Sequence, residues 1–345
     1  MPIALLKFPT DLLREVFQLC NPFELYKLSI CSKRTQRCVM LGGRKNWKIR
    51  SNAVSSEVVH VDGFPRNFDK NEVLLYVDNL IYVFEKAAKP EDFFITQHFV
   101  GDRNFFRPDG RNLFRPEYVS IQCPDVDVEL FGSLLVTFGI PIVDRLRIDF
   151  GSFESFSNIA DILIGRNIEI KEFCVGETET RKVIDAVNYM SLINQMNITQ
   201  KFECEQKFLR RHNYQLNKYP DTIIIKWSFW FNIGQLLNNN CVRLELEKSM
   251  LRNEELDGFL KEWKKAGTFP NLRWLQIDSM KIDKNYRILE IVPPIRNSGK
   301  TYIKIEFGWN NHMGILGPVR ITKEEGTVGW LKVELGRSPN LKFLV

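Results

Sequence analysis

Apolar residues recur at helical spacing near the start of the chain. Leu12, Leu13, Val16, Phe17 and Leu19 recur at helical spacing, which predicts an apolar face on a short α-helix. A second helix start follows at 21–24, where an asparagine precedes a proline and a glutamate that can reach back to the cap. Because serine is a favoured cap residue, Ser32 predicts a third, basic helix. We therefore expect three short helices at the N-terminus.

The pattern changes after Trp47, where apolar segments alternate with polar ones. Segments 56–61 and 93–100 predict strands, and the apolar run 71–87 predicts a long helix. The stretch 101–116 is rich in Arg, Asn, Gly and Pro, and this composition predicts a loop.

An apolar phrase then recurs along the chain. In each copy an apolar or small residue is followed three positions later by a large apolar residue, and two positions later by another, which is the spacing of a leucine-rich repeat. The middle residues are 21 to 31 positions apart, close to the span of one strand plus one helix. These middle residues are Ile121, Leu146, Phe173, Phe202, Ile223, Leu244 and Leu275.

Helix candidates lie between these phrases, at 130–138, 155–164, 179–190, 230–237 and 253–266. Strand, helix and strand in series predict parallel strands joined by right-handed crossovers. We expect an α/β (α+β) fold, with a small three-helix domain over 3–47 and a leucine-rich-repeat-like curved sheet over 48–345. An ordinary open α/β sheet is the alternative.

Towards the C-terminus the apolar residues alternate again. Segments 287–292 and 301–307 predict strands that flank a hairpin at 293–300, and 328–335 predicts a further strand. We therefore expect the sheet to end in antiparallel strands.

Composition excludes several classes of protein. With 345 residues and 44% hydrophobic content, the chain can bury a sizeable core. It has no apolar run of the roughly eighteen residues that a membrane span requires, and Pro9 and Asp11 interrupt any signal-peptide pattern. The seven cysteines are odd in number and lack a Cys-x-x-Cys pair, which indicates reduced thiols. We expect an intracellular protein of the cytoplasm and/or nucleus, without membrane contact.

Positive charge is concentrated at the N-terminus. Residues 1–50 hold ten Lys or Arg against three Asp or Glu, whereas the remaining chain holds 38 against 39. A nucleic-acid footprint over the larger part of the chain is therefore not expected. The basic N-terminal segment is suited to phosphates or to an acidic protein.

The sequence gives no support for catalysis, a metal or a cofactor. The four histidines are scattered, and no nucleophile signature is present. Ser298-Gly299-Lys300-Thr301 ends like a phosphate-binding loop, but Pro294 occupies the position where that loop requires a glycine. We expect a protein that is not an enzyme.

The N-terminal pattern resembles the F-box. Phe8-Pro9 stands at the Leu-Pro position of that motif, Asn21-Pro22 stands at its turn, and Leu25, Leu28, Ser29 and Cys31 fall on its second helix. Thr35 departs from it, because many F-boxes carry an aromatic residue there. The resemblance implies binding to the acidic adaptor of an SCF ubiquitin ligase, and through it to a cullin. The implied adaptor contacts are Phe8, Pro9, Leu12, Leu13, Val16, Phe17, Pro22, Leu25, Leu28 and Cys31.

A second resemblance covers about 198–280. Phe259-Leu260-Lys261-x-Trp263 and Phe269-Pro270-Asn271-Leu272 are similar to the type 2 F-box-associated domain of nematode F-box proteins. The two resemblances imply a substrate-recognition subunit of an SCF-type ligase, with an unknown protein substrate held by the larger domain. A scaffold outside a ligase and a nucleic-acid binder acting through the basic N-terminal segment are the alternatives.

A candidate substrate surface follows from the repeat. Residues between the apolar positions of each predicted strand are expected to point to the exposed sheet face. They are Arg147, Asp149, Glu203, Ile224, Lys226, Arg243, Glu245, Trp274 and Gln276.

Overall fold

The computed structural model describes residues 5–20, 22–40, 47–52, 58–61, 64–67, 72–77, 80–86, 95–98, 118–123, 128–148, 153–177, 186–209, 214–307 and 312–345. The chain divides into two compact units, Met1–Gly176 and Glu177–Val345. Both units contain helices and strands, which confirms an α/β fold. The predicted domain boundary at residue 48 stays a prediction.

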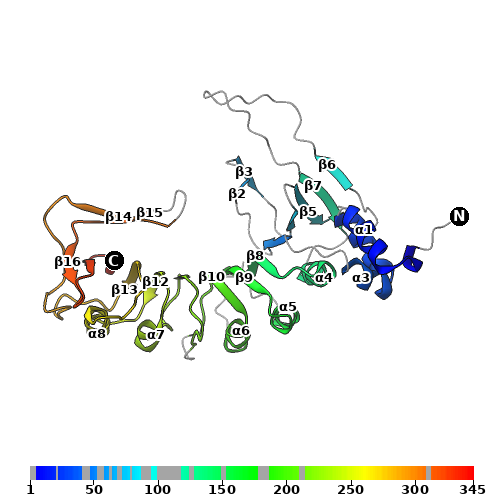
Figure 1. Cartoon of the computed structure of the whole chain (residues 1–345). Helices are drawn as coiled ribbons and strands as arrows, with labels where there is room; N and C mark the ends of the chain where they lie inside the picture. The colour runs from blue at the N-terminus through cyan, green and yellow to red at the C-terminus, as the bar shows by residue number, and fades with distance from the viewer. Residues whose placement is uncertain are drawn as a thin grey trace, which may run out of the picture. The chain divides into compact units, whose positions relative to one another are not determined.

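The N-terminal unit begins with a 3-10 turn η1 (Leu5–Lys7) and the helices α1 (Thr10–Leu19), α2 (Pro22–Cys31) and α3 (Lys33–Val39) (Figure 1). We call residues 5–40 the helical head. Leu13, Phe17, Leu25 and Val39 are buried in it. The predicted cap of α3 is present, because Ser32 Oγ accepts a hydrogen bond from the Thr35 amide at 3.1 Å. The predicted cap Asn21 lies outside the described residues.

Seven strands of this unit are hydrogen-bonded in the order β9-β8-β1-β4-β5-β7-β6. Their bounds are β1 (Lys48–Asn52), β4 (Glu72–Val77), β5 (Leu80–Lys86), β6 (Ile95–His98), β7 (Tyr118–Cys123), β8 (Ile142–Ile148) and β9 (Glu169–Val175). A separate hairpin pairs β2 (Val58–Val61) with β3 (Phe64–Asn67). The helix α4 (Val128–Phe138) precedes β8, and α5 (Phe153–Gly165) connects β8 to the parallel β9.

The predicted helix over 71–87 is wrong. The structure has two antiparallel strands there, β4 and β5, which pair Val73 with Phe84 and Val77 with Leu80. Valine, tyrosine and phenylalanine are common in this run, and such residues favour strands. The apolar run also lacks a polar helical face, since Val73, Leu74 and Leu75 are all buried. A sheet strand buried on both faces explains that pattern better than a helix.

The polar segment 101–116, predicted as a loop, lies outside the described residues. The strands predicted at 56–61 and 93–100 are present as β2 and β6 over their described parts. The first copy of the repeat phrase forms β7, but β7 pairs with β5 and β6. In the repeat series its expected place beside β8 is taken by β1, which runs parallel to β8. The repeat predicted that the strand of the first phrase, β7, lies next to the strand of the second, β8, and this prediction is wrong.

Within this unit the helical head contacts the sheet and α4 directly. The ring of Tyr26 meets the ring of Phe84 edge-on, with centroids 6.2 Å apart. The Gln36 amide donates to Thr137 Oγ1 at 3.5 Å. Just after the head, Trp47 meets Phe138 at 5.0 Å.

In the C-terminal unit the strand order is β16-β17-β18-β13-β12-β11-β10. The strands β10 (Asn197–Cys204), β11 (Thr222–Ile225), β12 (Arg243–Ser249) and β13 (Trp274–Ser279) are parallel neighbours, as the repeat predicted. The helices α6 (Val187–Ile193), α7 (Ile233–Asn238) and α8 (Asn253–Lys264) lie along one face of these strands (Figure 1).

The bounds of two predicted helices differ from those expected. Helix α6 spans Val187–Ile193 where 179–190 was predicted, and 178–185 lie outside the described residues. Helix α7 begins at Ile233 instead of 230, because Asn232 Oδ1 accepts from the Gln235 amide and so caps the helix there.

The sheet ends in antiparallel strands, which confirms the prediction. Strand β13 pairs with β18 (Asn340–Leu344), β18 with β17 (Val328–Glu334), and β17 with β16 (Val319–Thr322). A separate hairpin pairs β14 (Tyr302–Glu306) with β15 (His312–Leu316).

The strand predicted at 287–292 and the hairpin predicted at 293–300 are wrong. Residues 288–291 form a tight turn, in which the Ile288 and Ile291 backbones exchange two hydrogen bonds. The central residues Leu289 and Glu290 have positive φ values of 51° and 66°. A turn at 288–291 leaves no room for a strand over 287–292, so β14 pairs with the later strand β15.

The core of the C-terminal unit joins α8 to the antiparallel strands. The ring of Trp263 meets that of Phe343 edge-on at 4.7 Å. A Cβ atom added to Gly329 would lie 2.6 Å from the Phe343 ring and 2.8 Å from Trp263, so a glycine is required for this close approach. Leu256, Phe259, Leu260 and Trp263 are all buried, as the helical spacing of α8 predicted.

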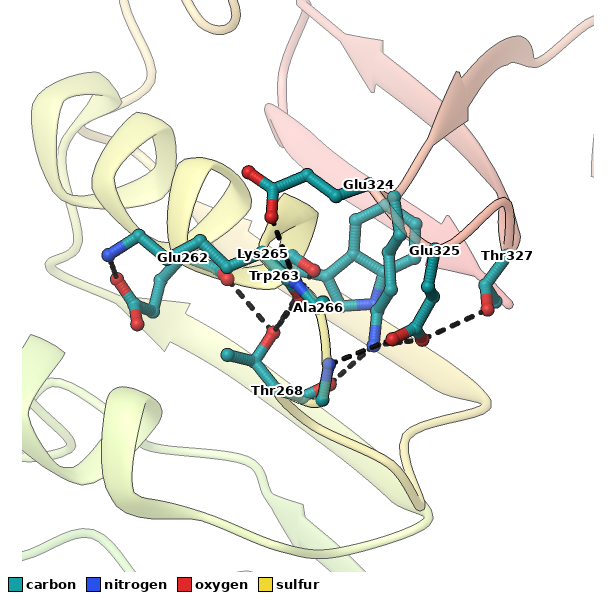
Figure 2. Close-up of polar contacts among 10 residues, drawn as sticks. Glu262, Trp263, Lys265, Ala266, Thr268, Glu324, Glu325 and Thr327 are labelled. Atoms are coloured by element: carbon teal, nitrogen blue, oxygen red, sulfur yellow. Dashed lines mark hydrogen bonds and ion pairs between the residues drawn. The ribbon is translucent and has the colours of Figure 1, made fainter.

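The loop after α8 is held by the turn between β16 and β17 (Figure 2). Glu324 accepts from the Ala266 amide, and Glu325 accepts from the Gly267 amide at 2.8 Å. Lys323 is buried and donates to the Thr268 carbonyl. These contacts satisfy backbone groups of residues 266–268, just beyond the end of α8.

Candidate functional site

The helix α1 carries two apolar stripes, and the structure buries one of them. Leu13 and Phe17 point into the helical head and are buried. Leu12 remains 42% exposed and Leu19 88% exposed, with the half-buried Val16 between them. Because the three lie at intervals of four and three, they form a continuous outward stripe.

Further apolar side chains of the head are exposed. Phe8, Ile30 and Met40 retain 37%, 59% and 40% of their accessible surface. A small domain rarely leaves several large apolar side chains in water unless a partner covers them. The head therefore has the character of a protein interface.

The predicted adaptor contacts divide into an outer and an inner set. Phe8, Pro9, Leu12 and Cys31 are exposed, Val16 and Leu28 are half-buried, and Leu13, Phe17, Pro22 and Leu25 are buried. The buried set shapes the head, and its role in binding stays a prediction. The predicted adaptor contacts omit the exposed residues Leu19, Ile30 and Met40. All three are apolar residues at helix ends, where helical spacing alone does not show which side chains the neighbouring helices cover.

The head also carries exposed cations. Lys33, Arg34 and Arg37 on α3 are exposed. Arg34 also donates to the Leu6 carbonyl at 3.3 Å, and Arg14 pairs with Asp11 at 3.5 Å. This surface is suited to an apolar partner with acidic residues at its rim.

The second candidate surface is the sheet face of the C-terminal unit opposite its helices. The strand register places Glu203, Ile224, Glu245 and Gln276 side by side in one row. All four are half-buried. The structure thus brings together four of the predicted substrate residues. Lys226 directly follows β11 and pairs with Glu205.

The neighbouring row, which holds Arg243 and Trp274, is not exposed as predicted. Trp274 retains 1% of its surface, because the hairpin β14–β15 packs over it through Ile305 and Ile315. Arg243 is buried as well, with its guanidinium 5.4 Å from the centre of the Phe307 ring. In Figure 1 the hairpin lies on the side of the strands opposite α7 and α8.

Two more predicted substrate residues lie in the N-terminal unit. Arg147 is buried and donates to the Cys174 thiol at 3.4 Å, so the expectation that it is exposed is wrong. Asp149 lies outside the described residues.

Ion pairs neutralise part of the sheet face. Lys201 pairs with Glu203 at 2.7 Å, and Arg243 pairs with Glu245 at 2.8 Å. Burial raises the pKa of Asp278, and Glu245 adds to this, whereas a hydrogen bond from Gln276 and the charge of Lys342 lower it. Burial and the nearby Asp278 likewise raise the pKa of Glu247. Burial therefore makes the charged form of both carboxylates less favourable than it is in water.

Acidic, thiol and histidine side chains in the described part of the chain form no group of three or more that is arranged to hold a metal ion. Burial raises the pKa of the Cys241 thiol to about 12, so this thiol is unreactive. Among the described helices, none combines the length and apolar composition that a membrane span requires.

Comparison with protein families gives two matches. Residues 5–43 match the F-box domain. Residues 211–277 match an F-box-associated domain. The F-box match covers the helical head with its exposed apolar stripe, and the F-box-associated match covers α7, α8 and β11 to β13 up to Ile277. Together they support an F-box protein family.

A comparison with curated proteins and one with solved structures each found no match. The F-box-associated match ends before the hairpin β14–β15 and the antiparallel strands. The cover over Trp274 is therefore formed by residues beyond either match.

Proposed function

We propose that this chain is a non-enzymatic substrate-recognition subunit of an SCF-type cullin ubiquitin ligase. The helical head binds the acidic adaptor and, through it, the cullin. The larger domain, a leucine-rich-repeat-like β/α sheet, captures a protein substrate. The observation that carries the proposal is the outward stripe of Leu12, Val16 and Leu19 on a segment that matches the F-box domain.

The physical task of such a subunit is tethering. A substrate held beside the charged ubiquitin carrier reacts at a high effective concentration, and the tethering chain needs no reactive group. The exposed apolar side chains of the head supply contact area, since burying a leucine contributes about 1.5–3 kcal/mol. The exposed basic residues of the head favour an acidic adaptor over other partners.

The test is a pair of substitutions that leaves the core of the head unchanged. Leu12→Glu with Leu19→Glu places charge on the outward stripe, whereas Leu25 is buried and unsuited to a binding test. Leu237→Glu with Leu316→Glu is the matched control, because both leucines are exposed, at 39% and 54%, on the C-terminal unit. We expect the head variant to lose co-purification with the adaptor and the control to retain it.

Circular dichroism of both variants checks that the fold is intact. A head variant that folds and still binds the adaptor contradicts the proposal. A scaffold role outside a ligase predicts adaptor binding without cullin, so reconstitution with adaptor, cullin and ubiquitin-conjugating enzyme separates the two. A protein that accumulates when this chain is depleted, and that the reconstituted complex ubiquitinates, supports the ligase role.

A further inference from the structure

Residues 280–300, here called the 280–300 strip, join β13 to β14 and follow a path that side chains of other elements define. The buried Asn253 amide at the start of α8 donates to the carbonyls of Asp283 and Tyr286 at 2.8 and 2.7 Å. Asp257, one turn later, accepts from the Leu289 amide at 2.8 Å. The strip is therefore held against α8 over its first half.

Its second half is attached by backbone hydrogen bonds to β17 and to the residue that follows β15. Ile295 exchanges two backbone hydrogen bonds of 2.9 Å with Val333 of β17. Beyond it, the Asn297 amide donates to the Gly317 carbonyl at 2.7 Å, at the base of the hairpin β14–β15. Asp278 of β13, Asn340 of β18 and Glu334 of β17 are register partners, so Val333, next to Glu334, lies level with the carboxyl end of β13. The strip therefore runs past the carboxyl end of β13. Loops at the carboxyl ends of parallel strands are frequent binding sites in α/β sheets.

The strip carries an excess of positive charge. It holds five Lys or Arg against two acidic residues, Asp283 and Glu290. All five cations are exposed, and within the described residues none of them forms an ion pair. They are Lys281, Lys284, Arg287, Arg296 and Lys300. Asp283 is occupied, since its carboxylate accepts from the Asn285 amide at 2.8 Å.

Apolar side chains are interleaved with these cations. Met280 is 69% exposed and Tyr286 55% exposed, and Ile291 and Val292 retain 41% and 46%. The turn at 288–291 holds two non-glycine residues at positive φ, a conformation that costs free energy. That turn leaves Ile291 and Val292 in solvent although isoleucine and valine are usually buried.

We propose that the 280–300 strip is a docking surface for an acidic segment of a captured protein, one in which apolar side chains alternate with Asp or Glu. The partner's carboxylates meet the unpaired cations, and its apolar side chains cover Met280, Tyr286, Ile291 and Val292. This inference rests on the proposed function and names the chemistry of the substrate.

A protein segment fits the strip better than a nucleic acid does. Single-stranded nucleic acids bind surfaces on which aromatic side chains stack with successive bases, and the strip has one aromatic residue, Tyr286. Three aliphatic or thioether side chains and two carboxylates are instead placed among its cations, which is the mixture found at protein interfaces.

The test uses the full chain bound to its adaptor and a fluorescent synthetic peptide in which Glu and Asp alternate with Leu and Phe. Two further peptides replace its acidic residues with Lys or its apolar residues with Ser. Fluorescence anisotropy measures binding. We expect the first peptide to bind more tightly than both others, with an affinity that falls as salt rises.

The decisive variant is Lys284→Glu with Arg287→Glu and Arg296→Glu. We expect roughly ten-fold weaker binding or more, because each change replaces attraction by repulsion. The matched control is Arg166→Glu with Lys264→Glu and Arg273→Glu, three exposed cations outside the strip, and it should bind the peptide like the parent chain.

Equal binding by the parent and the strip variant overturns the inference, as does tighter binding of the complex to single-stranded DNA or to phosphatidylserine vesicles than to the acidic peptide. Binding of the Lys peptide as tight as that of the acidic peptide overturns it too. The strip variant must keep the adaptor, since the head is unchanged. The two proposals therefore fail in different experiments. If the docking surface is wrong, peptide binding does not respond to the strip variant. If the proposed function is wrong, adaptor binding does not respond to Leu12→Glu with Leu19→Glu.

Discussion

Lys323 is buried, and its ammonium donates a hydrogen bond to the carbonyl of Thr268, although 55 residues separate the two in the chain. Its side chain is 3% exposed, and its ammonium also lies 3.5 Å from Glu325 and 5.4 Å from the centre of the Trp263 ring. A buried ammonium without such partners would cost several kcal/mol. The contact therefore links the loop after α8 to the turn between β16 and β17, as the neighbouring Glu324 and Glu325 do in Figure 2.

Replacing Lys323 by methionine tests this link. Lys323→Met keeps most of the packing on Trp263 but removes the donor to the Thr268 carbonyl. We expect the free energy of unfolding to fall by about 1–3 kcal/mol, as when a buried acceptor loses its partner. Urea denaturation measures it.

Lys304→Met is the control for this substitution. Lys304 pairs with Glu306 at 3.0 Å, but both side chains are more than half exposed, so its loss should leave stability unchanged. Equal stability of Lys323→Met and the parent chain would show that the link contributes nothing.

Two glycine-to-alanine changes should have opposite effects. Gly329→Ala places a methyl group against Phe343 and Trp263 in the core, so we expect a loss of about 1–3 kcal/mol. Gly258→Ala adds a methyl group within α8 with no atom within 4 Å, and we expect a gain of about 0.5–1 kcal/mol from helix propensity. Thermal and chemical denaturation check both. The same sign for the two variants would contradict this account of the core.

The hairpin β14–β15 should depend on its inward side chains. Ile305 packs on Trp274 and is buried, whereas Tyr302 of the same strand is 54% exposed. We expect Ile305→Ala to cost about 2–4 kcal/mol and to speed amide exchange throughout residues 302–306 and 312–316. Tyr302→Ala should have a smaller effect on both measurements. Exchange rates that do not differ between the variants would be inconsistent with packing of the hairpin on the sheet.

The pH dependence of stability should report on Asp278. Burial raises the pKa of its carboxyl above the ordinary value, so the folded chain holds this proton more tightly than the unfolded chain does. The resulting stabilisation is present below the unfolded pKa and is lost as pH rises through the folded pKa. Asp278→Asn should therefore stabilise the chain at pH 7, by less than about 1 kcal/mol for a half-buried group.

Urea denaturation at pH 7 and at stepwise lower pH measures this difference. The advantage of Asp278→Asn should shrink as pH falls towards the ordinary pKa of 3.8. Glu290→Gln, which changes an exposed carboxylate of the same unit, is the control. A stability difference for Asp278→Asn that is constant with pH would contradict the assigned cause.

Prediction from sequence succeeded where local signals were strong and consistent. Helix α8 begins at Asn253 as predicted, because its apolar residues keep helical spacing over about two turns and Glu255 accepts from the Arg252 amide at its start. The prediction failed at 71–87, where an apolar run without a polar face gave no periodicity to separate a helix from two buried strands.

The candidate sites divide in the same way. The strand register that aligns Glu203, Ile224, Glu245 and Gln276 follows from the repeat phrase. The cover over Trp274 does not, because it comes from a hairpin some thirty residues later, beyond the range of any local pattern. Likewise the spacing on α1 shows two apolar stripes, and only tertiary packing decides that Leu13 is buried while Leu12 and Leu19 remain exposed.

By itself the sequence determined the α/β class, the basic N-terminal helices, the parallel strands β10 to β13 and the best-formed helix, since each depends on residues close together in the chain. Tertiary structure alone decided which apolar surfaces meet water, where the hairpin β14–β15 lies, and how the 280–300 strip is anchored to Asn253, Asp257 and Val333. The physical reason is that burial and charge pairing depend on contacts between residues far apart in the chain. The surfaces proposed for binding are defined by those contacts.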